Sequence, residues 1–133
     1  MIIVDTSVWI DYFNGVDTNE TSILDVSFGK QEVAIGDLIV LEILCGFRLD
    51  KDYSTAKKYL AHLHHYNMLN PQLALKAADN YRKLRKKGIT IRKTADIIIA
   101  TFCIDQKLPL LYTDRDFTPF TQHLKLRSVS PKT

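Results

Sequence analysis

Short aliphatic runs recur along the chain, and they give the first expectation for its fold. The opening run, 2–4, is Ile-Ile-Val without polar alternation and stops at Asp5. Such a run is typical of a strand that is covered on both faces of a parallel sheet. We expect the strands of the sheet at 2–4, 32–35, 68–69, 110–113 and 125–129.

Apolar residues at helical spacing lie between these runs. Residues 52–65 place their apolar side chains on one side of an amphipathic helix. A long helix is expected to begin at Pro71 and to end near Gly88. Asp37 and Thr94 are the expected N-caps of two further helices. The predicted helices are 7–13, 21–28, 38–47, 52–65, 71–87 and 95–107.

The alternation of strands and helices predicts an α/β protein. We expect a three-layer sandwich in which a central, mainly parallel sheet is flanked by helices. The chain has 133 residues, and we find no internal repeat, low-complexity segment or long linker in it. Because this length suits one core, residues 1–133 are expected to form a single domain.

Composition and charge narrow the class of protein. The chain is 46% hydrophobic and 25% charged, which is the profile of a globular domain. Its formal net charge of +3 permits a polyanionic partner without requiring one. Cys45 and Cys103 are far apart and flanked by aliphatic residues, which indicates reduced, buried thiols rather than a disulfide or a zinc site.

We expect neither a secretory signal nor a membrane span. Met1 stands directly before an aliphatic run and an acid, without the basic start and cleavable apolar segment of a signal peptide. The longest uncharged apolar stretch, 97–104, is far shorter than the roughly 20 residues that a membrane span needs. The expected location is therefore the cytoplasm.

Acidic residues stand where apolar runs stop or are interrupted, and this pattern is the main indication of function. They are Asp5, Glu42, Asp96 and the pair Asp114 and Asp116. A carboxylate beside buried aliphatic residues costs free energy unless it is paired or holds a cation. Asp5 and Asp114 each follow a predicted strand, so both are expected at the carboxyl edge of the sheet, where open α/β sheets bind ligands.

Each acid also has a local explanation. Asp5 can simply end a strand, and Asp96 can strengthen a helix start. Asp114 and Asp116 can form a turn. Glu42 is the hardest to explain locally, because a lone acid in an apolar helical segment needs a partner. One shared site accounts for all of these acids, and we prefer it.

Converging carboxylates would repel one another, which would raise some of their pKa values and favour a divalent cation. Hard oxygen ligands suit Mg²⁺ or Mn²⁺, whereas the Cys and His spacing of a zinc site is absent from the sequence. One or two such ions can orient a water, lower its pKa for in-line attack on a phosphodiester and stabilise the leaving oxygen. The predicted reaction class is metal-assisted hydrolysis.

Four segments form a further pattern that extends over nearly the whole chain. They are IIVDTSVWID at 2–11, Glu42 with Gly46, TAD at 94–96 and TDRDF at 113–117. Together and in this order they resemble the PIN-domain ribonucleases and, more narrowly, the VapC toxins of bacterial and archaeal toxin–antitoxin modules. The resemblance implies a PIN-like fold and a metal-dependent endoribonuclease that acts on RNA, works as a homodimer and is silenced by a cognate antitoxin protein.

The resemblance also implies roles for individual residues. Catalysis and metal binding would belong to Asp5, Glu42, Asp96 and Asp114. The family's last acid falls at either acidic place of the closing motif. We rank Asp114 first because it directly follows a predicted strand, and we keep Asp116 as a fifth ligand or a supporting acid. Thr6 and Thr113 are expected to hydrogen-bond the carboxylates or a water on the metal.

Basic residues gather just before the third acid, and they are either RNA contacts or an ordinary solvated face. They are Arg82, Lys83, Arg85, Lys86, Lys87, Arg92 and Lys93. Arg92 and Lys93 are the preferred RNA-binding residues, because they are nearest to the predicted metal edge.

Histidines at the end of an amphipathic helix match no metal spacing: His62, His64 and His65. Core or antitoxin-groove packing is expected for most of Trp9, Tyr12 and Phe13.

The leading hypothesis is a hydrolase, a metal-dependent endoribonuclease that acts as the toxin of a toxin–antitoxin pair. One alternative is a Mg-dependent phosphatase or phosphoacceptor domain of similar α/β architecture. Phosphatases of that type place a second acid two residues after the first, where this chain has Ser7. The other alternative is a non-catalytic RNA-binding relic, whose mark would be a lost acid, and none of the four is lost.

Overall fold

Four parallel strands form the centre of the molecule. The structure is a computed structural model that describes residues 1–30 and 32–129. The strands are β1 (Ile2–Val4), β2 (Val33–Gly36), β3 (His64–Tyr66) and β4 (Leu110–Leu111). They lie in the order β3-β2-β1-β4, and every pairing is parallel. The expected mainly parallel sheet is therefore confirmed.

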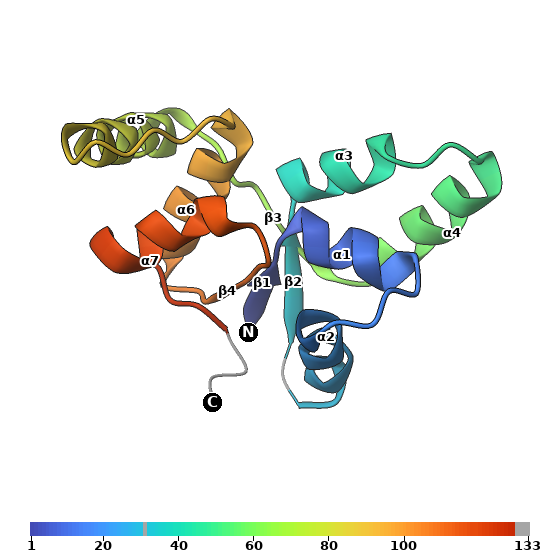
Figure 1. The fold of residues 1–133 in the computed structure, drawn as a ribbon. Coiled ribbons are helices and arrows are strands. Elements are labelled where there is room, and N and C mark those ends of the chain that lie inside the picture. The colour runs from blue at the N-terminus through green and yellow to red at the C-terminus, as the bar shows by residue number, and fades with distance from the viewer. Residues whose placement is uncertain (31, 130–133) are drawn as a thin grey trace.

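Helices cover the sheet from two sides, as expected of a three-layer sandwich. In Figure 1, α1 to α4 gather on one side of the strands, and α5 to α7 gather on the other. The helices are α1 (Thr6–Phe13), α2 (Asn19–Lys30), α3 (Asp37–Cys45), α4 (Asp50–Leu60), α5 (Pro71–Lys86), α6 (Thr94–Gln106) and α7 (Thr118–His123). A short 3-10 turn, η1 (Arg115–Phe117), joins β4 to α7.

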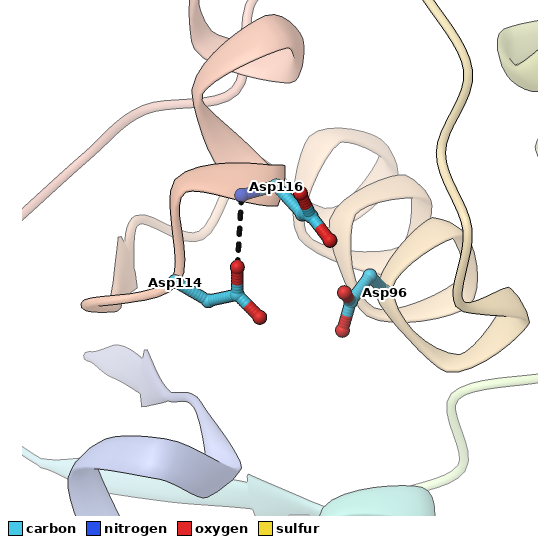
Figure 2. Close-up of side chains that lie close together, drawn as sticks. All are labelled: Asp96, Asp114 and Asp116. Atoms are coloured by element: carbon cyan, nitrogen blue, oxygen red, sulfur yellow. Dashed lines mark hydrogen bonds between the residues drawn. The ribbon is translucent and has the colours of Figure 1, made fainter.

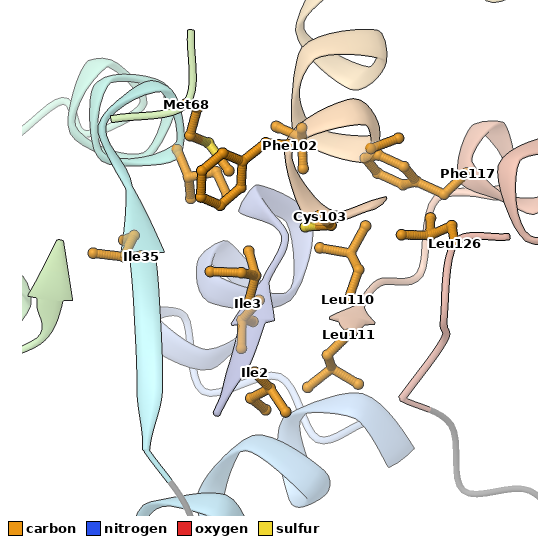
Figure 3. Close-up of a cluster of buried hydrophobic side chains, with 14 of the residues drawn as sticks. Ile2, Ile3, Ile35, Met68, Phe102, Cys103, Leu110, Leu111, Phe117 and Leu126 are labelled. Carbon is orange, nitrogen blue, oxygen red and sulfur yellow. The ribbon is translucent and has the colours of Figure 1, made fainter. Parts of the chain in front are cut away.

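The core fixes the edge of the sheet from which the acidic residues project. Every residue of β1, β2 and β4 is buried, as uninterrupted aliphatic strands require. Figure 3 shows Ile3 of β1 and Leu110 of β4 beside Phe102 and Cys103 of α6. Because β1 is paired on both sides, the residue that follows it is held in a rigid setting.

The region around β3 differs from the expectation. The predicted helix over 52–65 ends at Leu60, and the predicted strand at 68–69 is displaced to His64–Tyr66. The reason is that β3 is an edge strand with two exposed histidines, so it has no apolar pattern to reveal it. His65 Nε2 lies 2.9 Å from the carbonyl oxygen of Leu60, which helps to end the helix there.

Helix starts are also shifted by one residue. Asp37 is the first residue of α3 rather than its N-cap, and its Oδ1 accepts from the backbone N–H groups of Leu38 and Met68, at 2.8 and 3.1 Å. Thr94 is likewise the first residue of α6, and Lys93 is the N-cap. Asp37 thus ties the chain after β3 to the start of α3 rather than closing a helix end.

Two smaller expectations also need correction. The strand predicted at 125–129 is reduced to one bridge, between Leu110 and Ser128. Cys103 is buried as expected, but Cys45 is exposed at the end of α3, where the helix leaves the core. Its aliphatic neighbours in sequence therefore did not indicate its environment.

Gly36 offers a direct test of this packing. It ends β2, and a Cβ there would overlap the side chain of Met68, which is fully buried. Gly36→Ala should therefore lower the free energy of unfolding by about 1–3 kcal/mol, as measured by urea denaturation.

Gly29→Ala is the matched control, because Gly29 lies in α2 and its added methyl group would meet nothing within 4 Å. It should leave stability unchanged or raise it by about 0.5–1 kcal/mol. Equal losses in the two variants would contradict the packing argument.

Candidate functional site

The predicted acids come from four separate elements and meet in one cavity. Asp5 follows β1 and is the N-cap of α1, Glu42 is in α3, Asp96 is in the first turn of α6, and Asp114 precedes η1. The cavity has a volume of about 310 Å³. Its walls are formed by Asp5, Thr6, Ser7, Ile10, Asp11, Glu42, Lys93, Asp96 and Asp114.

Asp5 lies at the base of this cavity and is only 3% exposed. Burial raises the pKa of its carboxyl to about 6, and the negative charge of Glu42 adds to the rise. Hydrogen bonds from the Thr6 and Ser7 backbone and from the Ser7 hydroxyl, which donates to Oδ2 at 3.0 Å, act in the opposite direction. Asp5 is therefore held in position but is poorly compensated in charge.

Asp96 is the acid of the site whose charge is least compensated. It is 6% exposed, and its Oδ2 is buried without a hydrogen-bond partner among the described residues. Its pKa is raised to about 7, mainly by burial and also by the charges of Asp5 and Asp114, while Lys93 opposes the rise. A buried carboxyl oxygen without a donor is costly, and a bound cation would supply the missing partner.

The last two acids lie beside Asp96 on the turn that follows β4. Asp96, Asp114 and Asp116 can each offer an oxygen within 4.8 Å of the others, and Figure 2 shows the three side chains facing one space. Asp114 Oδ1 accepts from the backbone N–H of Asp116 at 2.9 Å. Asp114, but not Asp116, also lines the cavity that contains Asp5 and Glu42.

Asp114 differs electrostatically from its neighbours. Burial opposes its ionisation, but the Asp116 N–H and the ammonium of Lys93 outweigh that effect, so its pKa lies below its ordinary value. Lys93 Nζ lies 3.2 Å from Asp114 Oδ2. The site therefore combines two carboxyls that resist ionisation, at Asp5 and Asp96, with one that is readily ionised.

Glu42 has the partner that a lone acid in an apolar helix requires. The Thr6 hydroxyl donates to Glu42 Oε1 at 2.6 Å, which ties the start of α1 to the middle of α3. The hydrogen bond expected of Thr6 is thus present. Thr113, by contrast, is exposed and is not among the residues that line the cavity.

Two polar cavity residues, Ser7 and Asp11, were not among the predicted site residues. Asp11 lies four residues after Ser7 on α1, and both line the cavity. That spacing places them on one face of the helix, so it was a signal that the sequence contained. Their presence enlarges the polar wall on the α1 side.

The basic residues divide into three places. Lys93 lines the acidic cavity, whereas its neighbour Arg92 lines a separate, mainly apolar hollow with Leu69 and Ile98. The basic residues of α5 are exposed, and the Arg85 guanidinium lies 5.9 Å from the centre of the Tyr81 ring. Of the preferred pair, only Lys93 reaches the acids.

The aromatic and histidine residues take no part in the acidic cavity. Trp9 is fully buried, and its ring stacks on Phe13 at a centroid distance of 5.8 Å. Tyr12 and Phe13 are half-buried against the same cluster. Within residues 1–30 and 32–129, no potential metal-binding group of three side chains includes a histidine.

None of the described helices is long and apolar enough to cross a membrane.

Three comparisons with known proteins all relate this chain to the PIN domain or to proteins named VapC or VapBC. Residues 2–120 match the family described as the PIN domain. The chain is 28% identical over 134 residues to VapC ribonuclease Mb1587 of Mycobacterium bovis and to Ribonuclease VapC11 of Mycobacterium tuberculosis, and the match covers 98% of this chain and of each relative.

Solved structures resemble the chain over almost its full length. A structure of VapBC2 from Rickettsia felis, bound to a DNA fragment from the promoter, matches with a TM-score of 0.78 and 17% identity, over 97% of this chain and 98% of that one. VapBC-1 from Haemophilus influenzae matches with a TM-score of 0.75 and 16% identity, over 98% of both chains. At these identities the likeness establishes the fold.

The elevated pKa of Asp96 predicts how stability depends on pH. Its pKa in the folded, metal-free protein is about 7 against an ordinary 3.8, so the folded state binds more protons than the unfolded chain between these values. Its contribution to the free energy of unfolding therefore falls as pH rises through that window. Asp96→Asn should raise stability at pH 8 in a chelator by on the order of 2 kcal/mol, and the gain should vanish near pH 4.

Urea denaturation of both proteins across this pH range measures the difference. An Asn variant that is less stable than the native protein at pH 8 would contradict the electrostatic account of the site. Added Mg²⁺ should stabilise the native protein and leave Asp96→Asn unaffected.

The contact between Thr6 and Glu42 generates a second prediction. Thr6→Val should lower the free energy of unfolding by about 1 kcal/mol and weaken Mn²⁺ binding, because Glu42 loses the hydrogen bond that holds its carboxylate. Thr55→Val is the control, since the Thr55 hydroxyl bonds only an exposed backbone oxygen of α4. Native Mn²⁺ affinity in Thr6→Val, measured by titration calorimetry, would show that Glu42 needs no support from Thr6.

Proposed function

This chain belongs to the PIN domain family, and we propose that it is a metal-dependent endoribonuclease that hydrolyses phosphodiester bonds of RNA. The observation that carries the proposal is the buried Oδ2 of Asp96, which has no hydrogen-bond partner among the described residues, in a cavity that three further carboxylates of the predicted site also line. Such a site suits a divalent cation and, through it, a phosphate. The curated relatives quoted above are named ribonucleases, which supports RNA as the substrate.

The donor set fits Mg²⁺ or Mn²⁺, as one or two ions, because it consists of carboxylate oxygens. We assign metal binding and catalysis to Asp5, Glu42, Asp96 and Asp114, with Asp116 as a fifth ligand or supporting acid. When bound, the ion would lower the pKa of a water and stabilise charge on the phosphate. No side chain needs to be assigned as a dedicated general base.

The residues of the chain itself prepare this site in three ways. Ser7 holds the carboxylate of Asp5, and Thr6 holds that of Glu42. The N–H of Asp116 fixes Asp114. These bonds keep the oxygens converged, so little reorganisation is needed when a cation and a phosphate arrive.

We further propose that the chain is the toxin of a toxin–antitoxin pair, with residues 1–133 acting as one nuclease unit in the cytoplasm. The support is that chains from VapBC structures match its fold over 97–98% of this chain and 98% of theirs. The expected partners are a cognate antitoxin protein and a second copy in a homodimer. Arg92 and Lys93 are the proposed contacts to RNA phosphates, which would make RNA binding dependent on salt.

The alternatives are less well supported. A phosphatase of the type considered needs a free acid two residues after Asp5, but Ser7 stands there and its hydroxyl is bonded to Asp5. A non-catalytic relic would be expected to have lost part of the acidic site. All four acids line the same cavity instead.

Cleavage of a mixed RNA pool tests the proposal. With Mg²⁺ or Mn²⁺ the native protein should cut RNA, and Asp5→Asn and Asp96→Asn should each lose about 100-fold or more in rate, because charge at the metal site is removed. Asp79→Asn is the matched control, since Asp79 is an exposed acid of α5. Equal cleavage by all four proteins would indicate a contaminating nuclease and overturn the assignment.

A further inference from the structure

Lys93 is the one basic residue among the side chains that line the acidic cavity of the described structure. Its Nζ lies 3.2 Å from Asp114 Oδ2, and its side chain is 62% exposed. It therefore reaches the site from the solvent side, opposite to the buried base formed by Asp5 and Asp96.

The backbone conformation at the start of α6 places Lys93 at the cavity, and the side chain of Lys93 does not cap the helix. Lys93 is the N-cap of α6, in an extended conformation with φ −104° and ψ 121°, and makes no side-chain capping bond. Arg92, one residue earlier, lines a different hollow with Tyr81 and Ile97. The extended backbone thus sends two successive basic side chains to different places, and only the second meets the acids.

We propose that Lys93 is an internal counter-cation of the acidic site, which pairs with Asp114 while the metal is absent and gives way to the divalent ion when it binds. The released ammonium is then free at the cavity rim for a substrate phosphate. This proposal rests on the proposed metal-dependent nuclease and gives one residue two successive partners.

The ion pair between Lys93 and Asp114 is weak enough for a cation to replace it. An ion pair that is this exposed is weak, so a divalent cation with several carboxylate ligands can replace it. Lys93 also does not supply a partner to the most buried part of the site, because Asp96 Oδ2 has no hydrogen-bond partner among the described residues. Lys93 therefore reduces repulsion at the rim and leaves the buried base of the site to the metal.

The test compares Mn²⁺ affinity, measured from free Mn²⁺ by electron paramagnetic resonance, in the native protein and in Lys93→Gln. Lys93→Gln should bind Mn²⁺ about twofold to fivefold more tightly, because the upper end of the range for one competing exposed ion pair corresponds to about fivefold. Lys93→Arg, which keeps the charge, should stay within about twofold of native.

Arg115→Gln is the matched control. Arg115 is an exposed basic residue between Asp114 and Asp116 and does not line the cavity. Removing its charge changes the general field near the acids without breaking the Lys93 contact, so the gain in Mn²⁺ affinity should stay below about twofold. An equal gain in the two Gln variants would show that Lys93 acts only through this field and would overturn the proposal.

A second readout has the opposite sign. At saturating Mn²⁺, Lys93→Gln should raise KM for a single-stranded RNA, although it binds the metal more tightly. Unchanged or weaker Mn²⁺ binding in Lys93→Gln, with native protein that still binds Mn²⁺ and cleaves RNA, would overturn this inference alone. Failure of both native protein and Lys93→Gln to bind Mn²⁺ would overturn it together with the proposed metal-dependent function.

Discussion

Concentrated negative charge at the carboxyl edge of a parallel sheet is the constraint on which this structure depends. Asp5 and Asp96 are both nearly buried, and burial alone disfavours their ionisation. Such an arrangement persists only if a rigid core imposes it. The fully buried β1, paired on both sides, supplies that rigidity and places Asp5 where α6 delivers Asp96.

The elements around the sheet distribute this charge unevenly. The turn after β4 gives Asp114 a backbone donor and a direct contact with Lys93, so the pKa of Asp114 falls. The pKa of Asp96 rises, because burial and the neighbouring carboxylates outweigh the charge of Lys93. Thr6 bridges α1 to Glu42 in α3. The rim of the site, at Asp114, is therefore readily ionised, whereas the buried carboxyls of Asp5 and Asp96 resist ionisation until a cation compensates their charge.

Much of this was predictable because burial leaves a mark on the sequence. Uninterrupted aliphatic runs revealed β1 and β4, and an acid at the end of such a run revealed Asp5. The exposed edge strand β3 leaves no such mark, since its residues include two exposed histidines. Lys93 could not be separated from the other basic residues before Asp96, because the backbone angle at a helix start decides which of them reaches the cavity.

The choice between Asp114 and Asp116 shows where sequence reasoning reaches its limit. They are two positions apart, and a regular strand would point both side chains to the same face. The chain instead enters η1, in which the N–H of Asp116 bonds the Asp114 carboxylate and both side chains face Asp96. One turn therefore positions both acids, and they differ in neighbours rather than in access: Asp114 shares the cavity of Asp5 and Glu42, while Asp116 supports it from the side of α6.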